Sequence, residues 1–251
     1  MTDKPNILVI MTDQQRATAS HLYGNTCCET PSMARLADEG VLFENAISPH
    51  PLCVPCRISF WTSQFPHSHG GRRNQTLMPQ GATHAFQLWK AAGYTTGLIG
   101  KNHCFEQEDD LRLFDVMNDL MHGGDDPDKI RGMEWWRPRE GRDKVREQFR
   151  NMEPQSPRFA YGTTDLPLED QSSGLIAGQT VRFLEKHKDE PFALWVSFPD
   201  PHEPWMVAEE YAAMFPADKI DLPPWREGEF TDDRAPERNR VLYNILGMEE
   251  D

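Results

Sequence analysis

Cys53-Val54-Pro55-Cys56-Arg57 is the stretch around which the rest of this 251-residue chain can be arranged. Pro55 suits the first turn of a helix, where its missing backbone N–H costs nothing. We therefore predict a short buried helix that starts beside Cys53 and continues to Trp61. A group at a helix start faces unpaired N–H groups and a partial positive charge, which favour an anion. Arg57 adds a fixed cation suited to oxyanions.

Three simpler interpretations of the two cysteines stay open on this local sequence. Cys53 and Cys56 could form a redox pair, half of a zinc site or two ordinary buried thiols. No second CxxC occurs, so a four-cysteine zinc site has nothing to complete it. The chain has five cysteines, an odd number that does not suit a disulfide framework.

Composition allows a sizeable core and excludes two classes of partner. The aromatic share of 10%, with 7 Trp, is not that of a disordered chain. A formal net charge of −14 argues against binding to nucleic acid or to an anionic membrane surface. The longest apolar run, residues 7–11, is too short to cross a bilayer, and the N-terminus lacks the apolar region of a signal peptide. We therefore expect a cytoplasmic protein without a membrane or nucleic-acid partner.

Strand and helix signals alternate along the chain, which predicts an α/β fold with a mostly parallel central sheet. The apolar runs predict strands at 6–11, 41–47, 94–100 and 191–198. Helix signals lie at 30–40, where Met33, Leu36 and Ala37 form one apolar stripe, and at 83–92 and 172–188. We expect surface loops and short helices over residues 105–168 and a polar, proline-rich tail over residues 206–251.

Polar residues follow three of the predicted strands. Asp13 and Gln14 come after the first strand, Lys101 and His103 after the strand at 94–100, and His202 stands in a proline-rich turn after the strand at 191–198. The carboxyl ends of strands in α/β sheets are where ligands usually bind. Each signal is ambiguous alone, because Asp13 could cap a turn and a lysine or histidine at a strand end is often only solvated.

Taken together, these elements resemble the type I sulfatases of the alkaline phosphatase superfamily across nearly the whole chain. The pentapeptide at 53–57 is similar to the C-x-P-x-R motif of that family. Pro66-His-Ser-His69-Gly70 resembles its Pro-x-x-His-Gly element, and Gly100-Lys101-Asn-His103 resembles its Gly-Lys-x-His element. The resemblance implies an α/β/α sandwich with a mostly parallel central sheet.

The resemblance also implies the nucleophile and the cofactors. Cys53 would be oxidised by the formylglycine-generating enzyme, and the hydrate of the formylglycine would attack the sulfur of a small sulfate ester. A Ca²⁺ ion, or another divalent metal, would be held by Asp13, Gln14 and residue 53. Where the family commonly has two adjacent aspartates, this chain has Gln14 in the second place, whose amide oxygen can ligate a hard cation without adding charge.

The other site residues receive their roles from the same resemblance. Arg57 and Lys101 would neutralise the sulfate and the charge that develops in the transition state. His202 would protonate the leaving alcohol, and His103 would act as the general base that allows sulfate to be expelled. Weaker candidates for contact with the substrate are Asn74, Arg72 and Arg73.

One departure concerns the metal. The family completes its calcium site with an Asp-Asn or Asp-His pair downstream of the turn at His202, and no such pair after a strand occurs here; Asp232-Asp233 lies in a charged, strandless stretch. Ca²⁺ needs about six or more oxygens. We therefore expect the chain to be the N-terminal part of a sulfatase-like catalytic domain, or to be completed by another chain or in a homo-oligomer.

Two alternative functions remain. A phosphonate or phosphate ester hydrolase of the same superfamily would share the nucleophile and the metal, although Lys101 and His103 favour sulfate. A catalytically silent sulfatase-like fragment would fold, or bind a ligand, without turnover.

Overall fold

The computed structural model describes residues 4–122, 124–133, 147 and 161–220. Most of the predicted tail, residues 221–251 with Asp232-Asp233, lies outside the described residues. The chain divides into two compact units, Met1–Met214 and Phe215–Asp251. The described part of the second unit contains only the short 3₁₀ helix η4 (Ala217–Lys219).

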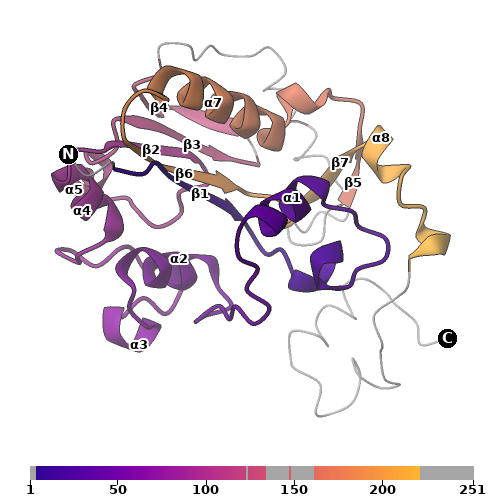
Figure 1. Cartoon of the computed structure of the whole chain (residues 1–251), viewed down its shortest axis with the longest axis horizontal. Coiled ribbons are helices and arrows are strands. Elements are labelled where there is room, and N and C mark those ends of the chain that lie inside the picture. The colour runs from indigo at the N-terminus through magenta and orange to yellow at the C-terminus, as the bar shows by residue number, and fades with distance from the viewer. Residues whose placement is uncertain (1–3, 123, 134–146, 148–160, 221–251) are drawn as a thin grey trace. The chain divides into compact units, whose positions relative to one another are not determined.

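A five-stranded sheet with the order β1-β6-β2-β3-β4 forms the centre of the first unit (Figure 1). The first four strands in this order pair in parallel, and β4 pairs antiparallel with β3. Their bounds are Ile7–Thr12 for β1, Phe192–Phe198 for β6, Thr95–Gly100 for β2, Val116–Met121 for β3 and Gly124–Arg131 for β4. The mostly parallel sheet predicted from the sequence is therefore confirmed. A separate two-stranded sheet pairs β5 (Tyr161–Thr164) with β7 (Trp205–Ala208).

Helices cover both faces of the central sheet, as Figure 1 shows for α7 on one side and for α2 and α4 on the other. The helices are α1 (Pro31–Glu39), α2 (Cys53–Thr62), α3 (Pro66–His69), α4 (Ala85–Ala91), α5 (Glu108–Leu111), α7 (Ser172–His187) and α8 (Glu209–Ala212). Three further 3₁₀ turns are η1 (Ala17–Ala19), η2 (His21–Tyr23) and η3 (Leu168–Asp170). The expected α/β/α sandwich is thus observed.

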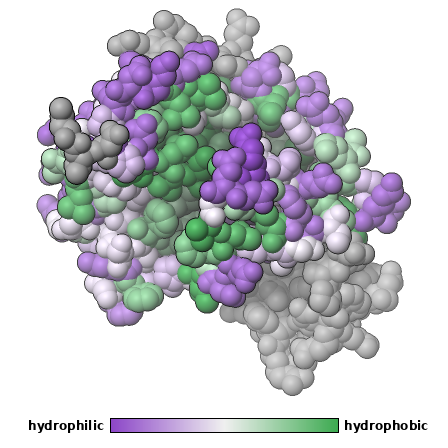
Figure 2. All heavy atoms as spheres, viewed as in Figure 1, coloured by the Kyte–Doolittle hydropathy of each residue, from purple (hydrophilic) through white to green (hydrophobic). Residues whose placement is uncertain are grey.

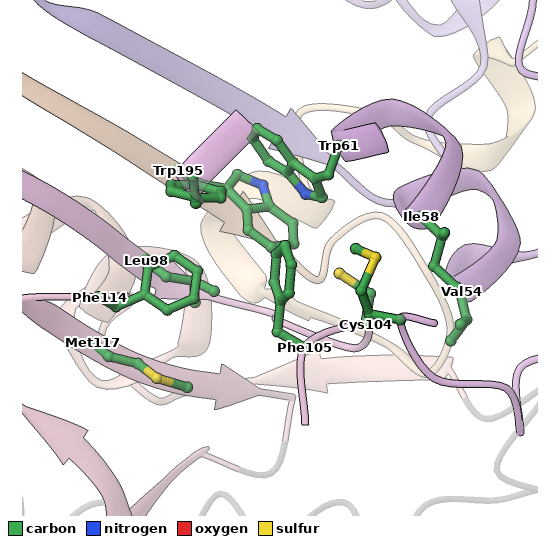
Figure 3. Close-up of a cluster of buried hydrophobic side chains, with 11 residues drawn as sticks. Val54, Ile58, Trp61, Leu98, Cys104, Phe105, Phe114, Met117 and Trp195 are labelled. Carbon is green, nitrogen blue, oxygen red and sulfur yellow. The ribbon is translucent and has the colours of Figure 1, made fainter. Parts of the chain in front are cut away.

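Successive residues of the buried strands serve the two cores, because side chains alternate across a sheet. On β2, Leu98 joins the cluster that includes α2 and α4, whereas Ile99 joins the cluster that includes α7. Aromatic residues fill the first cluster: the rings of Trp61 and Trp195 lie 4.8 Å apart, with Phe105 beside them (Figure 3). This packing fixes α2, the helix that begins at Cys53, against the sheet.

The predicted strand at 41–47 is wrong. The segment is irregular, and its apolar residues face solvent, with Val41 77% and Ile47 89% exposed. A strand needs a neighbour for its backbone groups, and none of the described strands pairs with this segment. The helix at 30–40 is confirmed as α1, but its apolar stripe is not buried, since Met33 and Leu36 are both exposed.

Strands β3, β4, β5 and β7 lie where only loops, short helices or a polar tail were predicted. Strand β3 has buried polar residues, Asn118 and Asp119, which obscured its apolar character in the sequence. Both find a distant partner in the fold: the Asn118 amide NH₂ donates to Gln179 on α7, and the Asp119 carboxylate accepts from the backbone N–H of Asn102. Distant partners of this kind cannot be seen in a local sequence pattern.

Strand β1 is at the edge of the sheet among the described strands. Its residues alternate between half-buried and exposed, and the exposed ones include Leu8 (41%) and Ile10 (56%). Figure 2 shows apolar residues gathered on the face of the molecule that carries this strand. Among the described residues, no helix is both long enough and apolar enough to pass through a membrane.

Candidate active site

Three strand ends and one helix start meet at the carboxyl edge of the sheet. Asp13 directly follows β1, Lys101 directly follows β2, and His202 stands four residues beyond β6. Because these strands are parallel neighbours, their carboxyl ends lie at the same edge. Cys53 is the first residue of α2, as the proline at its third position predicted. The structure thus brings four separated motifs of the sequence together.

Asp13 is the centre of this cluster. Its side chain is buried, and its Oδ2 lies 2.5 Å from Lys101 Nζ and 3.2 Å from Arg57 Nη2. Burial alone would raise the pKa of Asp13, but the charges of Lys101 and Arg57 outweigh it and hold the pKa below its ordinary value. At neutral pH the cluster therefore contains one carboxylate and two cations.

Arg57 is held by neutral groups as well as by Asp13. Its Nη1 donates to the backbone carbonyl of Lys101 (2.7 Å) and to Ser197 Oγ (2.9 Å). Its guanidinium lies 5.3 Å from the centre of the Trp195 ring, a distance at which a cation is attracted to an aromatic face. These contacts fix the guanidinium beside residue 53 in a way that a flexible ammonium group could not reproduce.

The Cys53 thiol faces Asp13 and Lys101. Its Sγ donates to Asp13 Oδ1 at 3.5 Å and lies 3.9 Å from Lys101 Nζ. Burial raises the pKa of Cys53 despite the nearby Lys101, so the group is a neutral thiol at pH 7. At the start of α2, the backbone N–H of Val54 donates to Asn74 Oδ1 at 3.1 Å.

The other interpretations of the cysteine pair receive no support from this geometry. Both thiols are free, and Cys56 Sγ accepts a hydrogen bond from Ser48 at 3.1 Å instead of facing Cys53. A reactive thiol in a redox pair needs a lowered pKa, whereas that of Cys53 is raised. Cys56 also takes no part in the one cluster of possible metal ligands found among the described residues.

The two predicted catalytic histidines differ in their surroundings. His103 has a left-handed backbone (φ 57°), and burial, helped by the charges of Lys101 and Arg57, lowers its pKa to about 4. It is therefore a neutral imidazole at pH 7. His202 donates from Nδ1 to the backbone carbonyl of Glu203 at 2.6 Å, which leaves Nε2 as the ring atom for other partners.

The remaining predicted residues, all of which the structure describes, form no hydrogen bond with Asp13, Arg57 or Lys101. Gln14 is exposed, and its Nε2 donates to Glu203 Oε2 at 2.9 Å. Arg72 and Arg73 are exposed on the loop after α3, and Asn74 is engaged at the start of α2. Substrate contact by Asn74, Arg72 and Arg73 stays a prediction.

Sequence reasoning missed His122, which stands at the carboxyl end of β3 in the same edge of the sheet. Its ring centre lies 6.1 Å from that of His202, and its Nδ1 lies 3.5 Å from Asp200 Oδ1. The backbone carbonyl of Asp200 in turn accepts from the N–H of Asp13 at 3.2 Å. The sequence around β3 does not predict a strand, so a histidine at its end has no special position in the sequence.

A metal ion would find part of a coordination shell here. One possible ligand atom each from Asp13, Cys53 and His202 lie within 4.8 Å of one another. Asp13 Oδ1 faces residue 53, whereas Asp13 Oδ2 is engaged by Lys101 and Arg57. A hard cation that takes six to eight oxygens would need further ligands beyond those of the described residues.

Comparison with known proteins places this geometry in context. The Sulfatase family model matches residues 5–244. The N-acetylglucosamine-6-O-sulfatase of Bacteroides thetaiotaomicron is 27% identical over 85% of this chain and 34% of its own length. The arylsulfatase of Clostridium perfringens is 27% identical over 95% of this chain and 52% of its own length. The chain therefore spans about a third to a half of the length of these two relatives.

The fold of this chain is also similar to that of a solved structure. The phosphonate monoester hydrolase of Agrobacterium radiobacter superposes with a TM-score of 0.67 at 23% identity, over 88% of this chain and 45% of the other. This likeness concerns the fold of the described sheet and its helices.

Proposed function

Because the chain belongs to the sulfatase family, we propose that it provides the nucleophile half of an enzyme that hydrolyses a small sulfate ester. The observation that carries the proposal is the buried cluster of Asp13, Arg57 and Lys101 around residue 53. One carboxylate and two cations give this cluster a local positive charge inside an acidic protein. Because a sulfate carries negative charge, this cluster favours it over the neutral parts of a substrate.

The nucleophile in this proposal is formylglycine made from Cys53 by the formylglycine-generating enzyme. As an unmodified thiol with a raised pKa, Cys53 is a poor nucleophile. In the structure its Sγ stands in for a hydroxyl oxygen of the hydrated aldehyde. A hydroxyl there would face Asp13 Oδ1, which can accept a hydrogen bond from it, and Lys101 Nζ, which can stabilise negative charge.

The two histidines would share the proton transfers. His202 keeps a proton on Nδ1, where the Glu203 carbonyl accepts it, and so presents Nε2 to the site. A second proton on Nε2 would go to the leaving alcohol. His103 is neutral at pH 7 and can therefore accept a proton from residue 53.

Ca²⁺, or another divalent metal, would be held by Asp13, Gln14 and residue 53, and it would supply Lewis-acid stabilisation of the sulfate oxygens. These ligands fit only part of the shell. A complementing chain or a second copy would supply the rest, and activity of this chain alone is part of what must be tested.

The test is hydrolysis of an aryl sulfate by the 251-residue chain after co-expression with the formylglycine-generating enzyme, with and without Ca²⁺. Mass spectrometry of the peptide that contains residue 53 reports conversion independently of turnover, and Cys53→Ala is the control. Calcium-dependent turnover that the control abolishes would support the proposal. A preference for an aryl phosphonate would replace it with the related phosphonate hydrolase, and an unconverted Cys53 would contradict it.

A further inference from the structure

Glu203 contacts both Gln14, a predicted metal ligand, and His202, the predicted general acid. Its side chain is only 11% exposed, although it is a carboxylate. Its Oε2 lies 2.9 Å from Gln14 Nε2 and 3.6 Å from His202 Nδ1. The backbone carbonyl of the same residue accepts the hydrogen bond from His202 Nδ1. A carboxylate so little exposed is retained at a cost in desolvation, which calls for a specific role.

The contact with Glu203 decides which way the Gln14 amide points. An ionised carboxylate can only accept hydrogen bonds, so the group that faces it must be the NH₂ of Gln14. The Gln14 oxygen is then the atom that stays available to a metal ion. The backbone of Gln14 is held in the left-handed region (φ 63°), where a glutamine is uncommon, so the surrounding fold imposes this position on the residue.

The same contact gives a physical reason for glutamine at position 14. An aspartate or glutamate there would place a second carboxylate against Glu203, and two like charges at hydrogen-bond distance repel. The neutral amide offers Glu203 a donor and keeps one ligating oxygen. The identities of residues 14 and 203 are therefore linked by chemistry and not only by proximity.

Glu203 also positions His202, the predicted general acid. The carbonyl of Glu203 keeps the proton of His202 on Nδ1, and its carboxylate lies close enough to offset a positive charge on that ring. Asp13 completes the frame from the other direction, because its backbone N–H binds Asp200 in the turn that carries His202. The loop after β1 and the turn after β6 are thus tied together at two points.

We propose that Glu203 is a positioning residue: it orients Gln14 with its oxygen toward a metal ion and holds the His202 ring for proton transfer. The inference rests on the proposed function for the metal and the acid. It does not make Glu203 a ligand, since the cluster of possible metal ligands among the described residues is formed by Asp13, Cys53 and His202.

Two measurements that need no turnover test this role. In the first, thermal unfolding of the metal-free chain is compared for wild type, Glu203→Met, Gln14→Met and the double variant. Either single change leaves a partner without its hydrogen bond and should lower Tm by about 2–4 °C. The double variant leaves no unpaired partner and should lose less than the sum of the two. Glu210→Gln, an exposed acid on α8, is the control for loss of charge.

In the second measurement, calorimetric titration with Ca²⁺ and with Mn²⁺ compares wild type, Glu203→Met and Glu203→Gln. Loss of an oriented partner behind a metal ligand weakens binding about tenfold or more, and we expect this for Glu203→Met. Glu203→Gln still has an oxygen that can accept from Gln14, so it should restore most of the affinity. This recovery by the conservative variant separates orientation from a general effect of charge.

Each result decides a different part of the inference. Additive losses of Tm would overturn the pairing of Gln14 with Glu203. If the decreases in Tm are not additive but wild type and Glu203→Met bind the metal ion with equal affinity, the orienting role is overturned. An absence of saturable metal binding in wild type itself would overturn the orienting role toward a metal ion held by this chain, whatever the melting cycle shows. The proposed function, in which a second chain completes the metal shell, would then be decided by the turnover assay.

Discussion

Lys101 Nζ lies 2.5 Å from Asp13 Oδ2, and both side chains are almost wholly buried at the carboxyl edge of the sheet. Removal of one partner of a buried ion pair leaves an uncompensated charge, which is expensive in free energy. We therefore expect Lys101→Met to lower the free energy of unfolding by roughly 3 kcal/mol, measured by urea denaturation.

Lys90→Met is the matched control for that variant. Lys90 forms an ion pair with Asp115 on the surface, where both side chains are more than a third exposed. Exposed pairs contribute about 1 kcal/mol or less. Similar losses for the two lysines would contradict the buried, unscreened character of the pair between Lys101 and Asp13.

The lowered pKa of His103 predicts how stability depends on pH without metal. Between pH 4 and the ordinary value of 6.5, the unfolded chain binds more protons at His103 than the folded chain does. Stability therefore rises with pH through this range, and it is lost as the pH falls from 6.5 toward 4.

Urea denaturation in the presence of a chelator, at several pH values between 7.5 and 4.5, measures this effect. His103→Gln should flatten the dependence on pH without removing it, because burial also lowers the pKa of His122. Asp13 does not affect this measurement, because its lowered pKa changes stability only at pH values near and below its ordinary pKa of 3.8. An unchanged slope in His103→Gln would show that the folded chain binds the proton at His103 as readily as the unfolded chain.

Arg57 should matter for binding of a free oxyanion. Its guanidinium is fixed by Ser197, by the Lys101 carbonyl and by Asp13, a set of acceptors that one ammonium group cannot match. We expect Arg57→Lys to weaken calorimetrically measured binding of inorganic sulfate at least about tenfold, since a charge-assisted hydrogen bond contributes about 1.5–3 kcal/mol. Arg112→Lys, an exposed change at the C-terminal end of α5, should leave the affinity unchanged.

Substitution of Asn74 distinguishes a structural role at the start of α2 from the predicted contact with the substrate. Because its Oδ1 accepts from the N–H of Val54, Asn74→Ala should cost about 1 kcal/mol of stability, as the loss of a helix cap does. Arg72→Ala and Arg73→Ala, at exposed positions, should change the free energy of unfolding by less than about 0.5 kcal/mol. A stable Asn74→Ala variant would remove the structural role and favour the predicted contact with the substrate.

The sequence allowed the principal strands and the start of the nucleophile helix to be predicted, because their signals are local. An apolar run followed by Asp13, and a proline two residues after Cys53, need no knowledge of the rest of the chain. The same local signals located Lys101 and His202, whose strands become parallel neighbours in the sheet.

What could not be predicted depends on distant partners. Strand β3 has polar residues, and only the fold shows that one of them, Asn118, is hydrogen-bonded to Gln179 on α7. His122 lies near His202 because it follows that strand. The Gln14–Glu203 pair joins residues 189 positions apart. For residues 41–47 a strand was predicted that does not form, since an apolar run favours a strand but cannot supply the neighbouring strand that it needs.

The exposed edge of β1 has a consequence for handling the protein. Leu8 and Ile10 lie on a strand that no described strand covers on its outer side. Open strand edges of this kind template pairing between chains and lead to aggregates. The chain made by itself should therefore precipitate or self-associate as its concentration rises, despite a net charge of −14 that would otherwise keep molecules apart in solution.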